Sequence, residues 1–119
     1  MKKSELFDGI LAKVCEVCEV DANAVLKGSK AQYVVDARCL AIQYMRRAGL
    51  SNDEIALIVL RKNHETEPDN NTVKKKAKAI DSLFKSYTER CLQSKVFCIL
   101  SKDINEWCIA TYKELIAKV

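Results

Sequence analysis

Apolar residues recur along this chain at steps of three and four, the spacing of one face of an α-helix. The clearest series runs through the second half of the chain and consists of Val73, Ala77, Ile80, Phe84, Tyr87 and Cys91. It predicts a helix that begins near Thr72 and reaches at least residue 88. Similar series predict helices over residues 4–18, 32–48 and 51–60, and a short helical turn over residues 22–27.

Capping residues mark several of these boundaries. Ser51 and Glu54 form a capping-box pattern, in which each side chain accepts a hydrogen bond from a free backbone N–H at the start of a helix. Gly49, just before them, suits the left-handed conformation that ends a helix, and Gly28 is expected to end the turn at 22–27 in the same way. Further N-caps are predicted at Ser4, Asp21 and Ser101.

The rest of the chain is also predicted to be helical. Residues 96–100 form a continuous apolar run, which we assign to a helix because no strand is predicted that could pair with it. The last helix has one apolar face, formed by Ile104, Trp107, Cys108, Thr111 and Leu115. With only 3 Gly and 1 Pro in 119 residues, long helices are favoured over a turn-rich β fold. We expect one all-α domain over residues 1–119, with about six helices.

Positive charge is concentrated in the middle of the sequence. The chain has 20 basic and 16 acidic residues, and residues 27–90 hold 13 of the basic and 8 of the acidic ones. On a helical wheel, the side opposite the apolar stripe of the helix at 72–88 carries Lys74, Lys75, Lys78 and Lys85. No acidic residue interrupts 72–80. This distribution indicates an anionic partner, although lysines also commonly occupy an ordinary solvated helix face.

Two amphipathic stretches between residues 50 and 84 form a pattern typical of a helix-turn-helix. In that motif a first helix braces a second one, which docks in the major groove of DNA. We expect Lys74, Lys75 and Lys78 to lie along phosphates, while Asn71, Thr72 and Lys75 at the start of the helix reach base edges. With helices at 51–60 and from 72 onward, the connector is 11 residues long, well above the usual turn of about 3–4 residues, unless the second helix begins earlier.

The order of these features resembles the C-terminal DNA-binding domain of the bacterial replication initiator DnaA, which has the fold of the Trp repressor. The likeness covers residues 25–84 and rests on the segments VLKGSK, VDARCLAIQYMRRAGLSNDEIALIV and TVKKKAKAI. It implies a helix-turn-helix core over residues 21–90, with a C-terminal helical extension over 91–119. It also implies double-stranded DNA as the partner, and a role in transcriptional regulation or in replication control.

The resemblance also implies further DNA contacts. In the family, a basic loop reaches the DNA backbone or the minor groove, and here this loop holds Lys27, Ser29 and Lys30. Arg38 corresponds to a helical arginine that contacts the backbone, the alternative being a salt bridge to Asp36 or Glu54. A family signature precedes the second helix and is interrupted here, and its first part is occupied by the candidate contacts Lys62, Asn63 and His64.

Other features of the sequence favour a different class. The acidic residues Glu65, Glu67 and Asp69 lie just before the second helix and would repel phosphates. They support a helical protein–protein interaction module that has lost DNA binding. The helices beyond residue 91 either complete the core or form a homodimer interface.

Enzymatic chemistry is not indicated. The only glycines are Gly9, Gly28 and Gly49, none in a phosphate-binding loop, so neither an ATPase module nor a bound nucleotide is expected. Cys15 and Cys18 have the spacing of zinc ligands but lack a second cluster, so we expect buried free thiols, no metal site and no cofactor. No stretch approaches the roughly 20 apolar residues that span a bilayer, and a cytoplasmic protein is expected.

Overall fold

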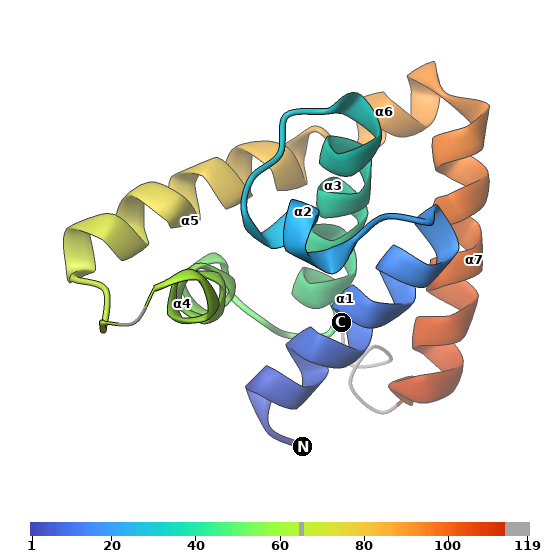
Figure 1. Ribbon diagram of the computed structural model, residues 1–119. Coiled ribbons are helices and arrows are strands. Elements are labelled where there is room, and N and C mark those ends of the chain that lie inside the picture. The colour runs from blue at the N-terminus through green and yellow to red at the C-terminus, as the bar shows by residue number, and fades with distance from the viewer. Residues whose placement is uncertain (65, 114–119) are drawn as a thin grey trace.

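Seven helices make up the fold in the computed structural model, which describes residues 1–64 and 66–113 (Figure 1). They are α1 (Lys3–Cys18), α2 (Ala22–Leu26), α3 (Gln32–Arg47), α4 (Asn52–Asn63), α5 (Asn70–Lys85), α6 (Tyr87–Gln93) and α7 (Lys95–Thr111). The part of the chain that the structure describes contains no strand, which confirms the predicted all-α fold. Glu65 and Leu115, both used in the sequence analysis, lie outside the described residues.

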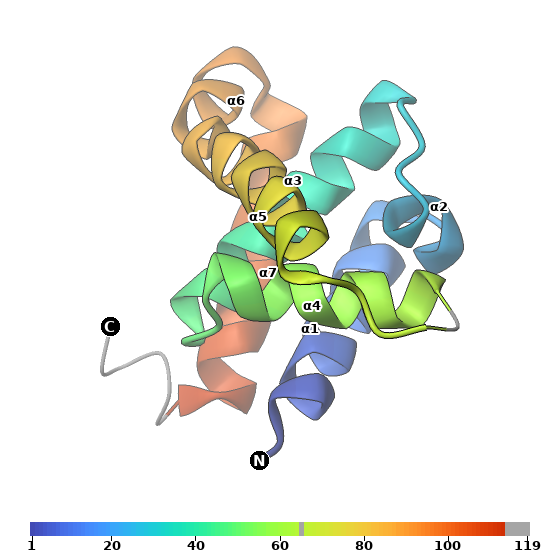
Figure 2. The ribbon, with the colours of Figure 1, turned by 90° about the vertical axis from the view of Figure 1, so that its left-hand side faces the viewer.

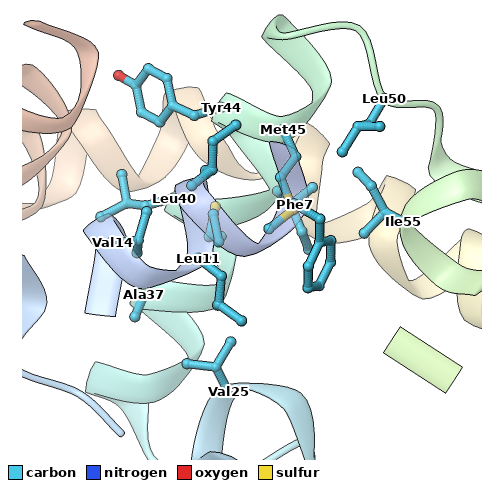
Figure 3. Packing of buried hydrophobic residues seen from close by; sticks show 14 of the residues in the cluster. Phe7, Leu11, Val14, Val25, Ala37, Leu40, Tyr44, Met45, Leu50 and Ile55 are labelled. Atoms are coloured by element: carbon cyan, nitrogen blue, oxygen red, sulfur yellow. The ribbon is translucent and has the colours of Figure 1, made fainter. Parts of the chain in front are cut away.

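Helix α3 lies at the centre of the fold, and α1, α4, α5 and α7 pack around it (Figures 1 and 2). Every residue from Cys39 to Met45 is buried, as expected for a helix that is covered on all sides. Figure 3 shows Leu40 and Met45 of α3 beside Phe7 and Leu11 of α1. Burial of one such side chain contributes about 1.5–3 kcal/mol, so this contact between α1 and α3 is a main source of stability.

Several helix boundaries follow the predicted capping residues. The Asp21 carboxylate accepts a hydrogen bond from the backbone N–H of Asn23 at the start of α2. Ser51 and Glu54 form the complete capping box of α4, with hydrogen bonds of 3.1 and 3.0 Å. Gly28 and Gly49 have φ angles of 81° and 106°, which lie in the left-handed region. Local sequence chemistry therefore sets these boundaries.

Two predicted caps were wrong. Helix α1 begins at Lys3, so Ser4 lies inside its first turn and Lys2 occupies the cap position without a side-chain hydrogen bond. Ser101 lies in the middle of α7, whose N-cap is Ser94. The Ser101 side chain is buried, and its hydroxyl lies 2.8 Å from that of Tyr44. Ser101 therefore serves the core, a role that a capping pattern in the sequence cannot distinguish.

The connector between α4 and α5 is shorter than the predicted 61–71. Helix α4 continues to Asn63 and α5 already begins at Asn70, which leaves residues 64–69 between them. The earlier start has a local cause, because the Asp69 carboxylate accepts a hydrogen bond of 2.8 Å from the backbone N–H of Thr72. The second helix begins two residues earlier than predicted, and the connector at 64–69 is still longer than the usual turn of about 3–4 residues.

The predicted continuation of the second helix to residue 88 was also wrong. Helix α5 ends at Lys85, and α6 begins at Tyr87 after a break at Ser86. The Ser86 hydroxyl donates a hydrogen bond of 2.7 Å to the main-chain oxygen of Leu83, a contact with which serine competes against regular helix geometry. The apolar series nevertheless stays on the inner side, and Tyr87 and Cys91 still pack against the core.

Helix α7 completes the core. Phe97, Ile104 and Cys108 are buried in the same cluster as the residues of α1 and α3. Trp107 is half-buried with its ring 5.5 Å from that of Tyr112, whereas Thr111, which was expected on the same face, is exposed. Among the helices that the structure describes, none has the length and apolar character needed to cross a membrane.

Candidate nucleic-acid interface

The N-terminal half of α5 presents an exposed polar and cationic face. Asn71, Thr72, Lys74, Lys75 and Lys78 are all exposed. The opposite side of the helix is fixed to the core by Ala77 and Ile80, which are buried. Because packing fixes the rotation of α5, all five predicted contact residues remain on its outer surface.

The electrostatic surroundings of this face favour an anion. No acidic residue lies between residues 70 and 80. None of Lys74, Lys75 and Lys78 takes part in a salt bridge to the described residues. The backbone N–H groups at the start of an α-helix add partial positive charge. The first half of α5 is therefore a cationic surface without a salt bridge to the described residues, although Asp69 interacts with Lys75 at longer range and Asp53 and Asp81 line one hollow with Lys74 and Lys78.

Two acidic residues near this face are held in local contacts. The hydrogen bond from the Thr72 N–H keeps the pKa of the Asp69 carboxyl below its ordinary value, because it stabilises the charged cap. Glu67 accepts three hydrogen bonds from the guanidinium of Arg61, the shortest 2.7 Å, and this contact lowers the pKa of Glu67. Glu67 is thus paired with a cation, while Asp69 stays ionised as the cap of α5.

The end of α4 brings the next three predicted contacts to the same region but gives two of them internal partners. The ammonium of Lys62 lies 2.8 Å from the carboxylate of Asp8 in α1. The Asn63 amide donates a hydrogen bond of 2.7 Å to the main-chain oxygen of Leu26, which ties α4 to α2. His64, the C-cap residue of α4, is exposed. Of these three residues, His64 has the side chain most available to a ligand.

The loop between α2 and α3 carries two exposed lysines, Lys27 and Lys30. Ser29 between them is half-buried, and its hydroxyl accepts a hydrogen bond of 3.4 Å from the backbone N–H of Ala31. The loop lies close to the second half of the molecule, since its Gly28 and residues of α5 line one cavity. Figure 2 shows α5 crossing in front of α3, with α4 below it and α2 to one side.

Arg38 takes a different position from both expectations. Its guanidinium donates hydrogen bonds to the main-chain oxygens of Ala24, Val25 and Ser29, at 3.3, 3.0 and 3.1 Å. The alternative partners from the sequence are occupied elsewhere, because Asp36 pairs with Arg90 and Glu54 pairs with Lys3. The predicted salt bridge of Arg38 was therefore wrong. The side chain instead holds the α2–α3 loop in place.

Sequence reasoning missed Lys76, which lies between two of the predicted contacts. Unlike its neighbours Lys75 and Lys78 it is half-buried, and it lines a cavity between α3 and α5. Burial lowers the pKa of its ammonium, and the nearby Arg38 guanidinium lowers it further. A signal was present in the sequence, since Lys76 lies three residues after Val73 and four before Ile80, at the margin of the apolar stripe.

All cysteines except the exposed Cys98 occupy positions expected of small apolar side chains. Cys15, Cys39 and Cys108 are buried, and burial raises the pKa of each thiol. Cys18 is half-buried, and burial also raises the pKa of its thiol, to about 11. A thiol needs to lose its proton to bind a metal, so these surroundings disfavour the zinc reading of Cys15 and Cys18. Among the described residues, no cluster of three or more potential ligands has the geometry of a metal site.

Comparison of this chain with protein-family models, with curated proteins and with solved structures finds no match.

Proposed function

We propose that this chain binds double-stranded DNA through a helix-turn-helix formed by α4 and α5. The observation that carries the proposal is the exposed face of α5, where Lys74, Lys75 and Lys78 have no carboxylate partner among the described residues. In this arrangement α4 braces α5, and the N-terminal half of α5 enters the major groove. Lys74, Lys75 and Lys78 lie along phosphates, while Asn71, Thr72 and Lys75 reach base edges.

The α2–α3 loop extends the proposed contact. Lys27 and Lys30 are exposed and lie on a loop that Arg38 holds through Ser29, while Asn63 binds Leu26, the last residue of α2 before the loop. Their charges reach the DNA backbone or the minor groove beside the groove that α5 occupies. In this proposal Arg38 and Asn63 act by positioning the loop, and His64 is the remaining contact at the end of α4. The biological role is control of transcription or of replication.

A salt titration tests the proposal. Binding of a labelled random-sequence duplex is measured by fluorescence anisotropy at increasing salt concentration. Because each neutralised phosphate contributes a slope of about −0.9 to a plot of log affinity against log salt, contacts by the five lysines of this proposal predict a slope of about −4 to −5. Failure to bind at low salt would exclude the proposal. Selection of bound sequences from a random pool then reports specificity and half-site spacing together.

A second candidate function is a protein interaction module, which is supported by a different surface of the molecule. Leu92, Val96 and Ile99 lie close together in the sequence at the junction of α6 and α7, and each is more than half exposed; we call them the apolar patch. Large apolar side chains that are exposed close together are typical of interaction sites. The patch suits a second copy of this chain, and a homodimer would present two copies of α5 to a two-fold symmetric DNA site.

A further inference from the structure

A cavity of about 500 Å³ lies between α2, α3, α4 and α5. Its wall is mainly apolar and includes Val25, Ile42, Val59 and Ile80, each from a different one of these helices. The volume lies within the range of about 300–1,000 Å³ that is typical of sites for small molecules. The cavity is therefore large enough to hold an organic ligand.

The polar groups of the cavity are all neutral or cationic. Arg38 and Lys76 lie on facing helices, and Arg90 lies at one end, while no acidic residue contributes to the wall. Asp36 neutralises Arg90 across a distance of 2.8 Å. Arg38 and Lys76, in contrast, make no salt bridge with the described residues. Arg38 is close enough to Lys76 for its charge to lower the pKa of the Lys76 ammonium. The cavity thus holds two cations without a carboxylate partner in the described part of the chain.

Donor groups remain available on both cations. Arg38 uses its Nε and Nη2 atoms for the main-chain oxygens of the loop, and its Nη1 atom makes no hydrogen bond to the described residues. That atom is not among the buried polar atoms without a partner, so it keeps contact with solvent. Both side chains are half-buried, and partial burial of a cation is unfavourable unless the cation is paired; a second cation beside it increases the cost. A bound anion would remove this cost by pairing with both cations.

We propose that this cavity binds a small organic carboxylate with an apolar body, whose carboxylate lies between Arg38 and Lys76. The apolar part of the ligand would fill the space between α3 and α5, against residues such as Ile42 and Ile80. The two cations would accept the charge, with Nη1 of Arg38 and the ammonium of Lys76 donating hydrogen bonds to the carboxylate. This site lies on the inner side of α5, away from the exposed face of Lys74, Lys75 and Lys78.

The test uses two probes that differ in charge, 4-phenylbutyrate and its neutral analogue 4-phenyl-1-butanol. Binding to the full chain is followed by nuclear magnetic resonance, and by calorimetry for the affinities. We expect 4-phenylbutyrate to bind more tightly than the alcohol, and both to shift the methyl signals of Ala41 and Ile80, which line the cavity. Absence of binding by 4-phenylbutyrate in the low millimolar range, or equal affinity for both probes, would overturn the proposal.

Two variants locate the site. Lys76→Gln removes one cation and should lower the affinity for 4-phenylbutyrate about ten-fold, with no effect on the alcohol. Lys78→Gln removes an exposed lysine of the same helix and should leave both affinities unchanged. Ala79→Leu is compatible with the helix and fills the mouth of the cavity, so it should weaken both probes. If Ala79→Leu leaves the affinity for 4-phenylbutyrate unchanged, the ligand binds elsewhere and the proposal fails.

None of these measurements contains DNA. A failure of the proposed DNA binding therefore leaves the ligand measurements interpretable, and a failure of ligand binding leaves the DNA proposal standing. A circular dichroism spectrum of each variant confirms that helix content is retained before affinities are compared.

Discussion

The guanidinium of Arg38 donates a hydrogen bond of 3.1 Å to the main-chain oxygen of Ser29. The sequence predicted DNA contacts for both residues, and the structure joins them to each other. The same guanidinium also binds the oxygens of Ala24 and Val25, so one side chain joins two carbonyl groups at the end of α2 to one in the loop that follows. A short helix leaves its last carbonyl groups without partners within the helix, and Arg38 supplies these partners.

Replacement of Arg38 should therefore destabilise the fold as well as the loop. We expect Arg38→Ala to lower the free energy of unfolding by about 1–3 kcal/mol, because buried carbonyl oxygens lose their donors. Arg38→Lys should recover little of this loss, since a single ammonium cannot reproduce the planar arrangement of donors. Urea denaturation followed by circular dichroism measures both values.

Arg61→Ala is the matched control, because Arg61 pairs with Glu67 at the surface and has no contact with the core. Exposed ion pairs contribute little to stability, so this variant should unfold like the wild type. If Arg38→Ala is as stable as Arg61→Ala, the internal hydrogen bonds do not hold the loop.

The sequence predicted well those features that depend on neighbouring residues. The capping box at Ser51, the Asp21 cap and the glycines at 28 and 49 are set by local chemistry, and the structure confirms them. Ser101 shows where prediction from neighbouring residues fails. Its role depends on Tyr44, which is 57 residues away in the sequence, so its hydroxyl could not be distinguished from a helix cap.

The candidate site likewise has a part that local sequence patterns predicted and a part that depends on the fold. The exposed face of α5 follows from helical periodicity alone, and Lys74, Lys75 and Lys78 lie where the wheel placed them. The internal partners of Lys62 and Asn63 come from α1 and α2, and no local pattern indicates them. The cavity beside Lys76 is formed by four helices, so it becomes visible only once the fold is known.

Gly9 in α1 allows a test of close packing. A Cβ atom at this position would collide with the hydroxyl of Tyr112, which is buried after the end of α7. Alanine is favoured over glycine within a helix by about 1 kcal/mol, and the collision opposes this gain. We expect Gly9→Ala to destabilise the wild-type protein but to stabilise the Tyr112→Phe variant, which lacks the hydroxyl.

The four proteins of this double-mutant cycle are compared by thermal unfolding. The change in stability caused by Gly9→Ala should have opposite signs in the two backgrounds. Equal effects in both backgrounds would mean that the hydroxyl of Tyr112 does not limit the space beside Gly9.

Burial of Cys108 makes stability sensitive to alkaline pH. Burial raises the pKa of this thiol from 9.0 to about 11, so the unfolded chain loses the proton at a lower pH than the folded chain. The contribution of the protonated thiol to the free energy of unfolding is fully present below pH 9 and is lost as pH rises from about 9 to about 11. The free energy of unfolding should therefore fall over this range, by at most about 1.4 kcal/mol for each pH unit from this group.

Denaturation with urea at pH 8, 9 and 10 under reducing conditions measures this dependence. Cys108→Ala should reduce the alkaline loss of stability, whereas Cys98→Ala, at an exposed position, should leave it as in the wild type. An identical pH dependence in all three proteins would exclude a contribution from the buried thiol.

The apolar patch at the junction of α6 and α7 predicts self-association. Leu92 and Ile99 are 83% and 61% exposed, and their burial between two copies would remove this apolar surface from water. We expect sedimentation equilibrium to show a dimer that Leu92→Ser together with Ile99→Ser converts to a monomer. Tyr33→Ser changes a similarly exposed apolar residue outside the patch and should leave the dimer intact. A wild-type protein that is monomeric at all concentrations would contradict the prediction.

The exposed lysines of α5 provide the most direct test of DNA binding. Lys74→Glu together with Lys75→Glu replaces two cations that have no internal partner among the described residues, so the fold should be retained while DNA binding is lost. The neutral pair Lys74→Gln and Lys75→Gln should weaken binding and make the salt dependence shallower by about 2, since each lysine accounts for roughly one phosphate.

A control with the same net charge separates a specific surface from general attraction. Lys95→Glu together with Lys102→Glu places the same change on α7, where both lysines are exposed. Long-range attraction depends on total charge, whereas a docked helix depends on where the charge lies. The α7 variant should therefore keep most of the wild-type affinity at physiological salt. If both charge-reversed variants lose affinity equally, α5 does not form the DNA contact.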